Sequence, residues 1–521
     1  MATDVLDRRR ALTWPGTRAA EVAVTVAGLA LLLALSLYLR TRAILAGFWI
    51  DEGLSVGISS FPLTEIPGVL KQDGSPPLYY LLLHVWMDAF GTSEGATHAF
   101  SLAAALATIP AALWAGWSLF GRWAGWIAAL LAACNPFLTI YAQESRMYAL
   151  VILLSLVTTA CFLHAFVFRR RLYVPLFALS LLLLVYTHNW GLFFGLGTLA
   201  ALALAARDSR DRRGLLIDAA LAYGAVAVLY APWLPTLISQ AQHTGAPWSD
   251  TPSPVQLSGG FMVVLAGQGA IVAIILAGLV GLKHYVQGPD TRPRTAVLAA
   301  LALAVTTLVT AWVFSQFTAA WATRYLGVLV GPTLLVAAAV LPRAGRLGLV
   351  ALGLVALFWI PYTAPTNKSN PKQLAALFEE NVEPGDVILS TQPEQVPVLA
   401  YYFGDDLRYA TPLDDDADTR VMDWRDAVER LETVEPQETL DPVLDAVPPG
   451  GHLLVVYPVF RDSAQWRAPW TSLVRQRSAR WRTRISIDPR FTRTQEYTPP
   501  YTGRAFRLPL AVEVYEKTGS G

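Results

Sequence analysis

Charged residues and cysteines are scarce in this sequence. Of its 521 residues only 15% are charged, and the net charge is +1, so the chain lacks the strongly basic surface of a nucleic-acid-binding protein. Two cysteines are present, Cys134 and Cys161, and both lie in apolar runs. This excludes a disulfide framework and predicts that both thiols are small core side chains.

Hydrophobic residues make up 54% of the chain, which is typical of a protein with many membrane-spanning helices. The first apolar run, Glu21 to Leu39, provides the ~20 residues that a bilayer requires. Because Arg8-Arg9-Arg10 precede this run, we expect a cytoplasmic N-terminus and a retained first span in place of a signal peptide. Arg40 and Arg42 are expected to extend to the far interface.

Blocks of arginine mark the cytoplasmic ends of later spans. The strongest are 169–171 and 207–213, and the hairpin between them turns outside near 187–190. The other predicted spans are 78–90, 98–120, 147–168, 214–236, 259–282, 296–317, 323–341 and 347–363. A crossing at 123–141, with Pro136 in its middle, would break the alternation. We therefore predict that this segment enters and returns as two short helices, in a protein of about 11–13 transmembrane helices.

Beyond residue 363 the composition becomes that of a soluble domain, rich in proline and carboxylates. We predict a membrane domain of residues 1–363 and an extracytoplasmic α/β domain of residues 364–521, large enough for its own core. Expected strands are 387–390, 407–410, 452–457 and 512–515, and expected helices are 371–381, 424–433 and 470–481. This part has no glycine-rich phosphate loop and no metal-ligand spacing, so it is assigned no chemistry beyond a hypothetical lid or acceptor-docking role.

Two adjacent carboxylates, Asp51 and Glu52, follow directly on the first apolar run, in a predicted outer loop of residues 47–76. Hydrocarbon does not hold unpaired carboxylates cheaply, so the pair must lie at the membrane edge or in a wet cavity. One interpretation is a solvated pair of carboxylates that ends a helix. The other is a general base for a hydroxyl substrate, because a partly desolvated carboxylate beside a second one can have a raised pKa.

Asp73 precedes a Gly-Ser-Pro-Pro turn that leads back into the membrane. It either caps this turn or is a third carboxylate facing the same cavity. In the second interpretation it orients the acceptor or completes a divalent-cation site with Asp51 and Glu52. Tyr79 and Tyr80 come next, and they suit a platform for a sugar or lipid as well as an interfacial aromatic belt.

Glu144, Arg146 and Tyr148 lie at the start of the span after 123–141. Charges at the mouth of apolar segments are costly unless they are paired. An interfacial ion pair between Glu144 and Arg146 is one interpretation. The other is a guanidinium held for a lipid-linked phosphate, which its planar fork suits.

Arg324 and Tyr325 begin a later span on the outer side. They form either an interfacial anchor with an aromatic belt or a second phosphate clamp. His188 lies at the predicted outer hairpin turn. It is either a ligand or hydrogen-bond donor for the substrate or an ordinary interfacial histidine.

Four short motifs occur in order along the chain: DE at 51–52, DGSPPLYY at 73–80, YAQESRMY at 141–148 and TRY at 323–325. Together they resemble the bacterial protein mannosyltransferase-like group, that is, glycosyltransferase family 39 and its aminoarabinose-transferase relatives of the GT-C fold. The resemblance covers residues 45–345. It implies that Asp51 is the general base, with Glu52 beside it. It also implies that Arg146 and Arg324 bind phosphate and that Asp73 matches a second loop acid.

The resemblance further implies a multi-pass enzyme of the cytoplasmic membrane. Such an enzyme transfers a mannose-like sugar from a polyprenyl-phosphate donor to a hydroxyl of a protein, glycolipid or cell-wall glycan on the outer face. His98 replaces the basic residue that the family usually has after the second span. A divalent cation is possible but not required, because a lipid monophosphate carries little charge. Two alternatives stay open, a glycan ligase that uses a pyrophosphate-linked donor and a transporter, although the sequence shows no internal repeat.

Overall fold

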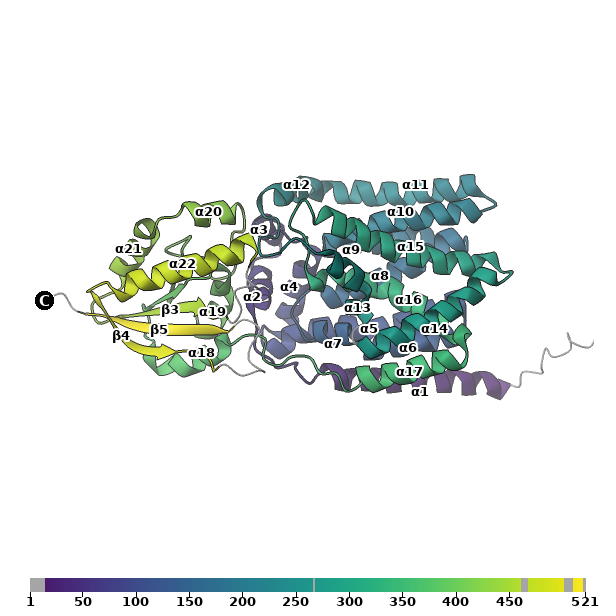
Figure 1. Ribbon diagram of the computed structural model, residues 1–521, viewed down its shortest axis with the longest axis horizontal. Helices are drawn as coiled ribbons and strands as arrows, with labels where there is room; N and C mark the ends of the chain where they lie inside the picture. The colour runs from purple at the N-terminus through teal and green to yellow at the C-terminus, as the bar shows by residue number, and fades with distance from the viewer. Residues whose placement is uncertain (1–14, 266–267, 461–466, 501–508, 519–521) are drawn as a thin grey trace, which may run out of the picture.

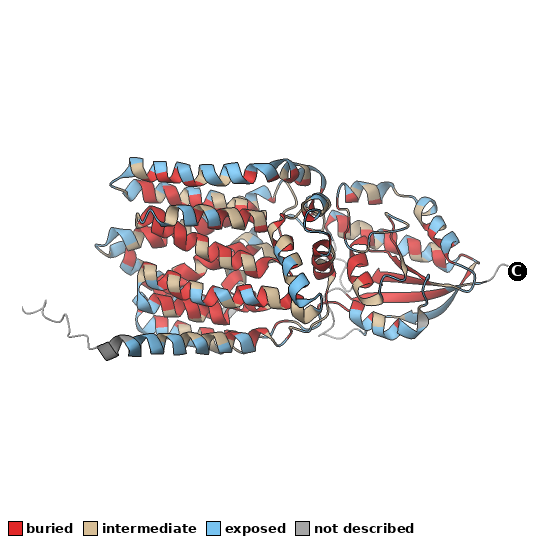
Figure 2. Ribbon diagram, turned by 180° about the vertical axis from the view of Figure 1, so that it is seen from behind, coloured by how far each residue is buried: buried red, intermediate tan, exposed pale blue. Residues whose placement is uncertain are grey.

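The computed structural model describes residues 15–265, 268–460, 467–500 and 509–518. A bundle of helices fills one end of the molecule and a domain with a β-sheet fills the other (Figure 1). The predicted cytoplasmic arginines 8–10 lie outside the described residues. The helices at the edges of the bundle, α1 and α11, are largely exposed (Figure 2). Exposed apolar side chains such as Val24 and Leu221 on these two helices suit a lipid environment.

Within the described residues, eight helices are long and apolar enough to cross a membrane. They are α1 (Pro15–Arg40), α5 (Glu94–Phe120), α8 (Tyr148–Phe162) with a π-helical turn, α10 (Trp190–Asp208), α11 (Arg212–Tyr230) continuing into α12 (Leu234–His243), α14 (Gln268–Gln287), α15 (Thr291–Phe314) and α16 (Val330–Val340) with its flanking 3₁₀ turns. Shorter apolar helices are α4 (Leu78–Phe90), α6 (Arg122–Cys134), α9 (Tyr173–Thr187), α13 (Pro254–Leu265) and α17 (Arg346–Trp359). The predicted single span at 259–282 is thus divided between α13 and α14.

Helix α4 does not cross the bundle, contrary to its predicted role as the second span. Its first turn follows Ser75 and Pro76, which line a cavity shared with the C-terminal domain. Just after its last turn, the carbonyl of Thr92 accepts a hydrogen bond from Tyr401 of that same domain, at 3.1 Å. Both ends of α4 therefore lie at one face.

The prediction that residues 123–141 enter the membrane and return is wrong. Gly28 of α1 lies against Trp126 of α6, and Arg40 at the end of α1 donates to the carbonyl of Ala132 at 2.5 Å. Helices α1 and α6 therefore run in the same direction, and α6 crosses. Arg40 is fully buried, so it does not extend to the interface as predicted.

Pro136 starts a helix and does not reverse the chain. It occupies the first turn of α7 (Pro136–Tyr141), where a missing N–H is harmless. The side chain of Asn135 caps this helix by accepting from Leu138 N at 2.8 Å. Since α4 stays at one face and α6 crosses, the segment after α7 still reaches the face that holds Asp51, as the sequence predicts.

The C-terminal part contains a five-stranded sheet in the order β2-β1-β3-β5-β4. Its strands are β1 (Val387–Ser390), β2 (Arg408–Ala410), β3 (His452–Pro458), β4 (Phe491–Tyr497) and β5 (Leu510–Lys517). Strands β2, β1 and β3 are parallel, whereas β5 is antiparallel to both β3 and β4. This mixed sheet with flanking helices confirms the predicted α/β class.

Helices cover both faces of the sheet (Figure 1). They are α18 (Pro371–Phe378) and α19 (Val396–Phe403) on one face, and α21 (Pro436–Ala446) and α22 (Pro469–Ser486) on the other, with α20 (Ala427–Thr433) packed against α22. Trp481 and Leu444 lie in the core of the second face, and Phe378 and Leu399 in that of the first. The sequence predicted neither α19, α21 nor β4.

Helix α2 (Ile50–Ser59) lies between the bundle and the C-terminal domain, with α3 (Ile66–Asp73) beside it (Figure 1). A Cβ added at Gly53 would lie 2.6 Å from Val398 Cβ, and one added at Gly57 would lie 2.2 Å from Arg420 O. These glycines are four residues apart, so they share one face of the helix. Only glycine allows the C-terminal domain to approach α2 this closely.

We expect Gly53→Ala to destabilise the protein, because the added methyl group overlaps the backbone and side chain of Val398. Overpacking of this kind costs about 1–3 kcal/mol. Thermal unfolding in detergent measures the effect. Gly68→Ala is the control, since open space surrounds Gly68 in α3 and alanine in a helix gains up to ~1 kcal/mol. Equal melting temperatures for Gly53→Ala and the wild type would contradict this contact.

Candidate active site

The first turn of α2 directs Asp51 and Glu52 to different surroundings. Both acids suit the positive end of the helix dipole, and Glu52 also accepts from the free N–H of Trp49 at 3.4 Å. Consecutive residues on a helix point about 100° apart. As a result Glu52 is fully buried beneath the helix, while Asp51 is half-buried and lines a cavity.

Glu52 is held by groups from three other parts of the chain. Its Oε1 lies 2.6 Å from His98 Nε2 on α5, 2.8 Å from Ser145 N and 2.9 Å from Lys368 Nζ. Lys368 lies on the linker to the C-terminal domain, and it also donates to the carbonyl of Gln143 at 2.7 Å. Burial by itself raises the pKa of Glu52, but the charges and hydrogen bonds of Lys368 and His98 outweigh burial and hold this pKa below its ordinary value. Glu52 is therefore ionised at neutral pH and serves as an anchor.

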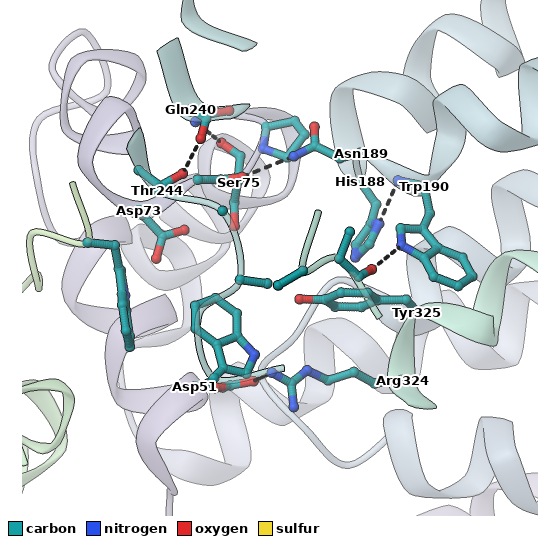
Figure 3. A pocket seen from close by; sticks show the side chains of 18 of the residues that line it. Asp51, Asp73, Ser75, His188, Asn189, Trp190, Gln240, Thr244, Arg324 and Tyr325 are labelled. Atoms are coloured by element: carbon teal, nitrogen blue, oxygen red, sulfur yellow. Dashed lines mark hydrogen bonds and ion pairs between the residues drawn. The ribbon is translucent and has the colours of Figure 1, made fainter. Parts of the chain in front are cut away.

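Asp51 contacts two guanidinium groups. Its Oδ2 lies 3.3 Å from Arg324 Nη2 and 3.7 Å from Arg146 Nε. Arg146 is further fixed by donating to the backbone carbonyl of Asp51 at 3.2 Å and to Ser55 Oγ at 3.0 Å. The guanidinium of Arg324 lies 5.6 Å from the ring centres of both Trp49 and Tyr325. Figure 3 shows Asp51 and Arg324 facing each other beside Tyr325.

These groups line a cavity of about 670 Å³, within the range of small-molecule sites. The structure brings together most of the residues that the sequence singled out. The predicted site residues in the lining are Asp51, Asp73, Arg146, His188, Arg324 and Tyr325. They come from α2, α3, the loop before α8, the α9–α10 turn and the start of the α16 span.

Asp73 and His188 occupy the part of the cavity away from Arg324 (Figure 3). Tyr80 donates to Asp73 Oδ2 at 3.4 Å, and desolvation in the cavity raises the pKa of Asp73. Burial, together with the charges of Arg146 and Arg324, lowers the pKa of His188 to about 3. Because its ring is then neutral at physiological pH, His188 Nδ1 accepts from Trp190 N at 3.1 Å and offers no positive charge to an anion.

Five predicted site residues do not line the cavity. The structure therefore gives no support to direct substrate contacts by Glu52, Tyr79, Tyr80, Glu144 or Tyr148. The tyrosines are buried behind the lining, where Tyr148 packs against Tyr325 and His188. The geometry makes Tyr80 a support for Asp73.

The proposed cation site of Asp51, Glu52 and Asp73 does not fit the geometry. Both oxygens of Glu52 lie within 3.0 Å of Lys368 Nζ, which competes with any metal. Among the described residues, no group of three or more His, Cys, Asp or Glu side chains could hold a metal ion. We therefore derive no step through a metal.

Sequence reasoning missed one wall of the cavity. The C-terminal domain contributes Gln392, Glu394, Trp424 and Thr471 to its lining. It also missed Lys368, the partner of Glu52. No local pattern marks these residues, because a lysine after a last span resembles an interfacial anchor and the rest lie in ordinary soluble sequence.

No protein-family model and no curated protein sequence matches the chain. Several solved structures, however, match the chain. ArnT from Cupriavidus metallidurans bound to undecaprenyl phosphate matches with a TM-score of 0.60 and 14% identity, over 96% of this chain and 99% of that one. Its apo state matches with a TM-score of 0.56 and 12% identity, over 96% and 100%. The Archaeoglobus fulgidus oligosaccharyltransferase complex with Zn and sulfate matches with a TM-score of 0.53 and 15% identity, over 83% and 68%.

These likenesses establish the class of the fold. The chain has the GT-C fold, as the sequence resemblance implied. With its many apolar helices it is a multi-pass membrane protein that carries a C-terminal α/β domain. At these levels of identity the similarity defines the architecture alone.

We expect Lys368→Met to destabilise the protein strongly, because it leaves the Glu52 carboxylate charged and buried. Breaking a buried pair costs about 3–5 kcal/mol. The double variant Glu52→Gln/Lys368→Met should recover part of this loss, since no unpaired charge remains. Lys372→Met is the matched control: its ion pair with Glu94 is 56% exposed on the lysine side, and exposed pairs contribute below about 1 kcal/mol. If both lysine variants melted at the same temperature, Glu52 and Lys368 would not be a structural anchor.

Proposed function

We propose that the protein is a membrane glycosyltransferase. It transfers a hexose of the mannose type from a polyprenyl-phosphate donor to an acceptor hydroxyl at the outer face of the cytoplasmic membrane. The observation that carries this proposal is the meeting of one carboxylate, Asp51, and two guanidiniums, Arg146 and Arg324, in a cavity that is also lined by apolar side chains.

The donor phosphate would bind the two arginines. A guanidinium fork matches phosphate oxygens and remains charged at all physiological pH values. Arg146 and Arg324 are the only arginines or lysines among the described lining residues, and two positive charges suit a monophosphate better than a pyrophosphate. This is the reason to favour a monophosphate donor over the pyrophosphate donor of a glycan ligase.

The polyprenyl chain would leave the cavity along apolar side chains of its lining. The apolar lining residues from helices of the bundle include Leu192, Phe193, Leu237, Ile238 and Phe314. Leu237 and Ile238 lie on α12, and Ile238 is 51% exposed, so this side meets the lipid surroundings of the bundle. The ArnT structure with a similar fold was solved with undecaprenyl phosphate bound, which supports a lipid phosphate as the ligand.

Asp51 would act as the general base. Without substrate its carboxylate is paired with the two arginines, and an incoming phosphate competes for them and releases it. Asp51 then takes the proton of the acceptor hydroxyl, whose oxygen attacks the anomeric carbon from the face opposite the phosphate. The bond from that carbon to the phosphate oxygen breaks, and polyprenyl phosphate leaves with the electron pair. The sugar is inverted, and Arg146 and Arg324 stabilise the developing charge.

The cavity would face the outside of the cell. Arg169 pairs with Asp218 at 3.0 Å, one helix length away from the cavity, at the end of the bundle opposite the C-terminal domain. The arginines of 207–213 lie at the same end, between α10 and α11. Arginine-rich loops are retained in the cytoplasm. The N-terminus would therefore be cytoplasmic and the C-terminal domain extracytoplasmic.

Asp51→Asn should abolish most transfer in proteoliposomes supplied with a radiolabelled polyprenyl-phosphate hexose. The amide cannot take the proton, so we expect kcat to fall by about 10²–10⁴. Binding of undecaprenyl phosphate should stay the same or tighten, because the arginines lose a competing anion. Asp250→Asn, at an exposed position in the loop before α13, is the control. Undiminished transfer by Asp51→Asn would end the assignment of the base.

Arg324→Gln should reduce both transfer and phosphate binding. Loss of one donor to a developing negative charge lowers the rate by about 10²–10³. We also expect weaker binding of undecaprenyl phosphate, measured by displacement of a fluorescent lipid phosphate. The control is Arg346→Gln, an exposed arginine at the start of α17. If Arg324→Gln bound and reacted like this control, Arg324 would have no role in holding the donor.

A further inference from the structure

The wall that the C-terminal domain adds to the cavity is chemically unlike the opposite wall. The bundle side carries the guanidiniums of Arg146 and Arg324 together with the carboxyl groups of Asp51 and Asp73. The domain side carries a carboxylate, a carboxamide, a hydroxyl and an indole, from Glu394, Gln392, Thr471 and Trp424. A phosphate is attracted to the guanidiniums of the bundle side and meets no Arg or Lys among the described lining residues of the domain side. The second wall therefore suits a substrate other than the donor phosphate.

Glu394 has an oxygen that the protein leaves unsatisfied. The residue is only 4% exposed and lies in the short 3₁₀ turn before α19. Its Oε1 accepts from Gln392 Nε2 at 2.7 Å and from Trp470 Nε1 at 2.9 Å. Its Oε2 has no hydrogen-bond partner among the described residues. A buried oxygen without a partner is costly. Because Glu394 lines the cavity, a ligand hydroxyl that reaches this oxygen would satisfy it.

The side chains around Glu394 are arranged for a ring with hydroxyl groups. Trp424 packs between Trp248 and Trp470, with ring centres 4.8 and 5.2 Å away, which fixes its indole in the wall. Trp248 lines the same cavity. Aromatic faces contact the apolar C–H faces of a sugar, while carboxylates and amides bind its hydroxyls. Burial raises the pKa of Glu394, and such a carboxyl both donates to and accepts from hydroxyls when it is protonated.

We propose that Glu394, with Gln392, Thr471 and Trp424, forms the acceptor subsite and that the acceptor is an uncharged carbohydrate. This inference rests on the proposed glycosyl transfer and specifies its second substrate. The domain wall holds one hydroxyl of the acceptor sugar, so that a neighbouring hydroxyl reaches Asp51. An anionic acceptor meets no Arg or Lys among the described lining residues of the domain wall, and a peptide leaves the tryptophan faces without a matching ring.

Binding of neutral sugars to the full-length protein in proteoliposomes tests this subsite without the transfer reaction. The probes are a panel of neutral methyl hexosides and pentosides, their uronic acid counterparts and a serine- and threonine-containing peptide, followed by saturation-transfer NMR. We expect at least one neutral glycoside to bind, and Glu394→Ala to weaken its binding at least tenfold. Glu394→Gln, which keeps the shape and one oxygen, should weaken it three- to tenfold. Glu438→Ala, at an exposed position on α21, should bind like the wild type.

Undecaprenyl phosphate binding and thermal unfolding are measured on the same variants. For Glu394→Gln, the affinity for undecaprenyl phosphate should change less than twofold and the melting temperature by only a few degrees. The reason is that this substitution leaves Arg146 and Arg324 untouched. Preference for the uronic acids or the peptide would overturn the proposal. So would wild-type sugar binding by both Glu394 variants, or an equal loss of lipid phosphate binding. If the glycoside binds through Glu394 but the wild type transfers sugar from no polyprenyl-phosphate donor, the proposed function fails and the subsite stands.

Discussion

The buried charge of Glu52 is the interaction on which the geometry of the cavity depends. Its carboxylate joins four segments: α2 itself, α5 through His98, the loop before α8 through Ser145, and the linker after α17 through Lys368. Such a charge is stable in the interior only when its partners are in place. Folding therefore fixes the first turn of α2 relative to the bundle before any substrate arrives.

Asp51 gains its role from this anchor. With Glu52 turned inward, the preceding residue points into the cavity, where Arg146 and Arg324 hold it. The two adjacent carboxylates thus perform opposite tasks, one structural and one proposed to be chemical. The glycine face of α2 adds a second constraint, because Gly53 and Gly57 bring the C-terminal domain close enough to complete the cavity wall.

Much of the site could be identified from the sequence, but the wall contributed by the C-terminal domain could not. Asp51, Asp73, Arg146 and Arg324 were identifiable because charges at membrane edges are costly and therefore informative, and the cavity contains all four. Lys368 was not, since its partner Glu52 is 316 residues away in the chain and no local pattern records such a contact. The contribution of the C-terminal domain was hidden for the same reason.

The misassigned elements also have physical explanations. Helix α4 is apolar because tertiary contacts bury one of its faces, so its hydropathy resembles that of a membrane span. The error in α4 forced the compensating error at 123–141. Among the described strands, β4 pairs with β5 alone, at the edge of the sheet, and it exposes most of its polar side chains. It therefore lacks the alternation that identifies a strand.

A structure of the protein in a lipid nanodisc with undecaprenyl phosphate bound, determined by electron cryo-microscopy, tests the central claim most directly. We predict that the phosphate lies between Arg146 and Arg324, that Asp51 has left both arginines, and that Glu52 remains within hydrogen-bond distance of Lys368. A phosphate bound away from these arginines, or a Glu52 that turns from Lys368 toward the ligand, would contradict the division of tasks between the two carboxylates.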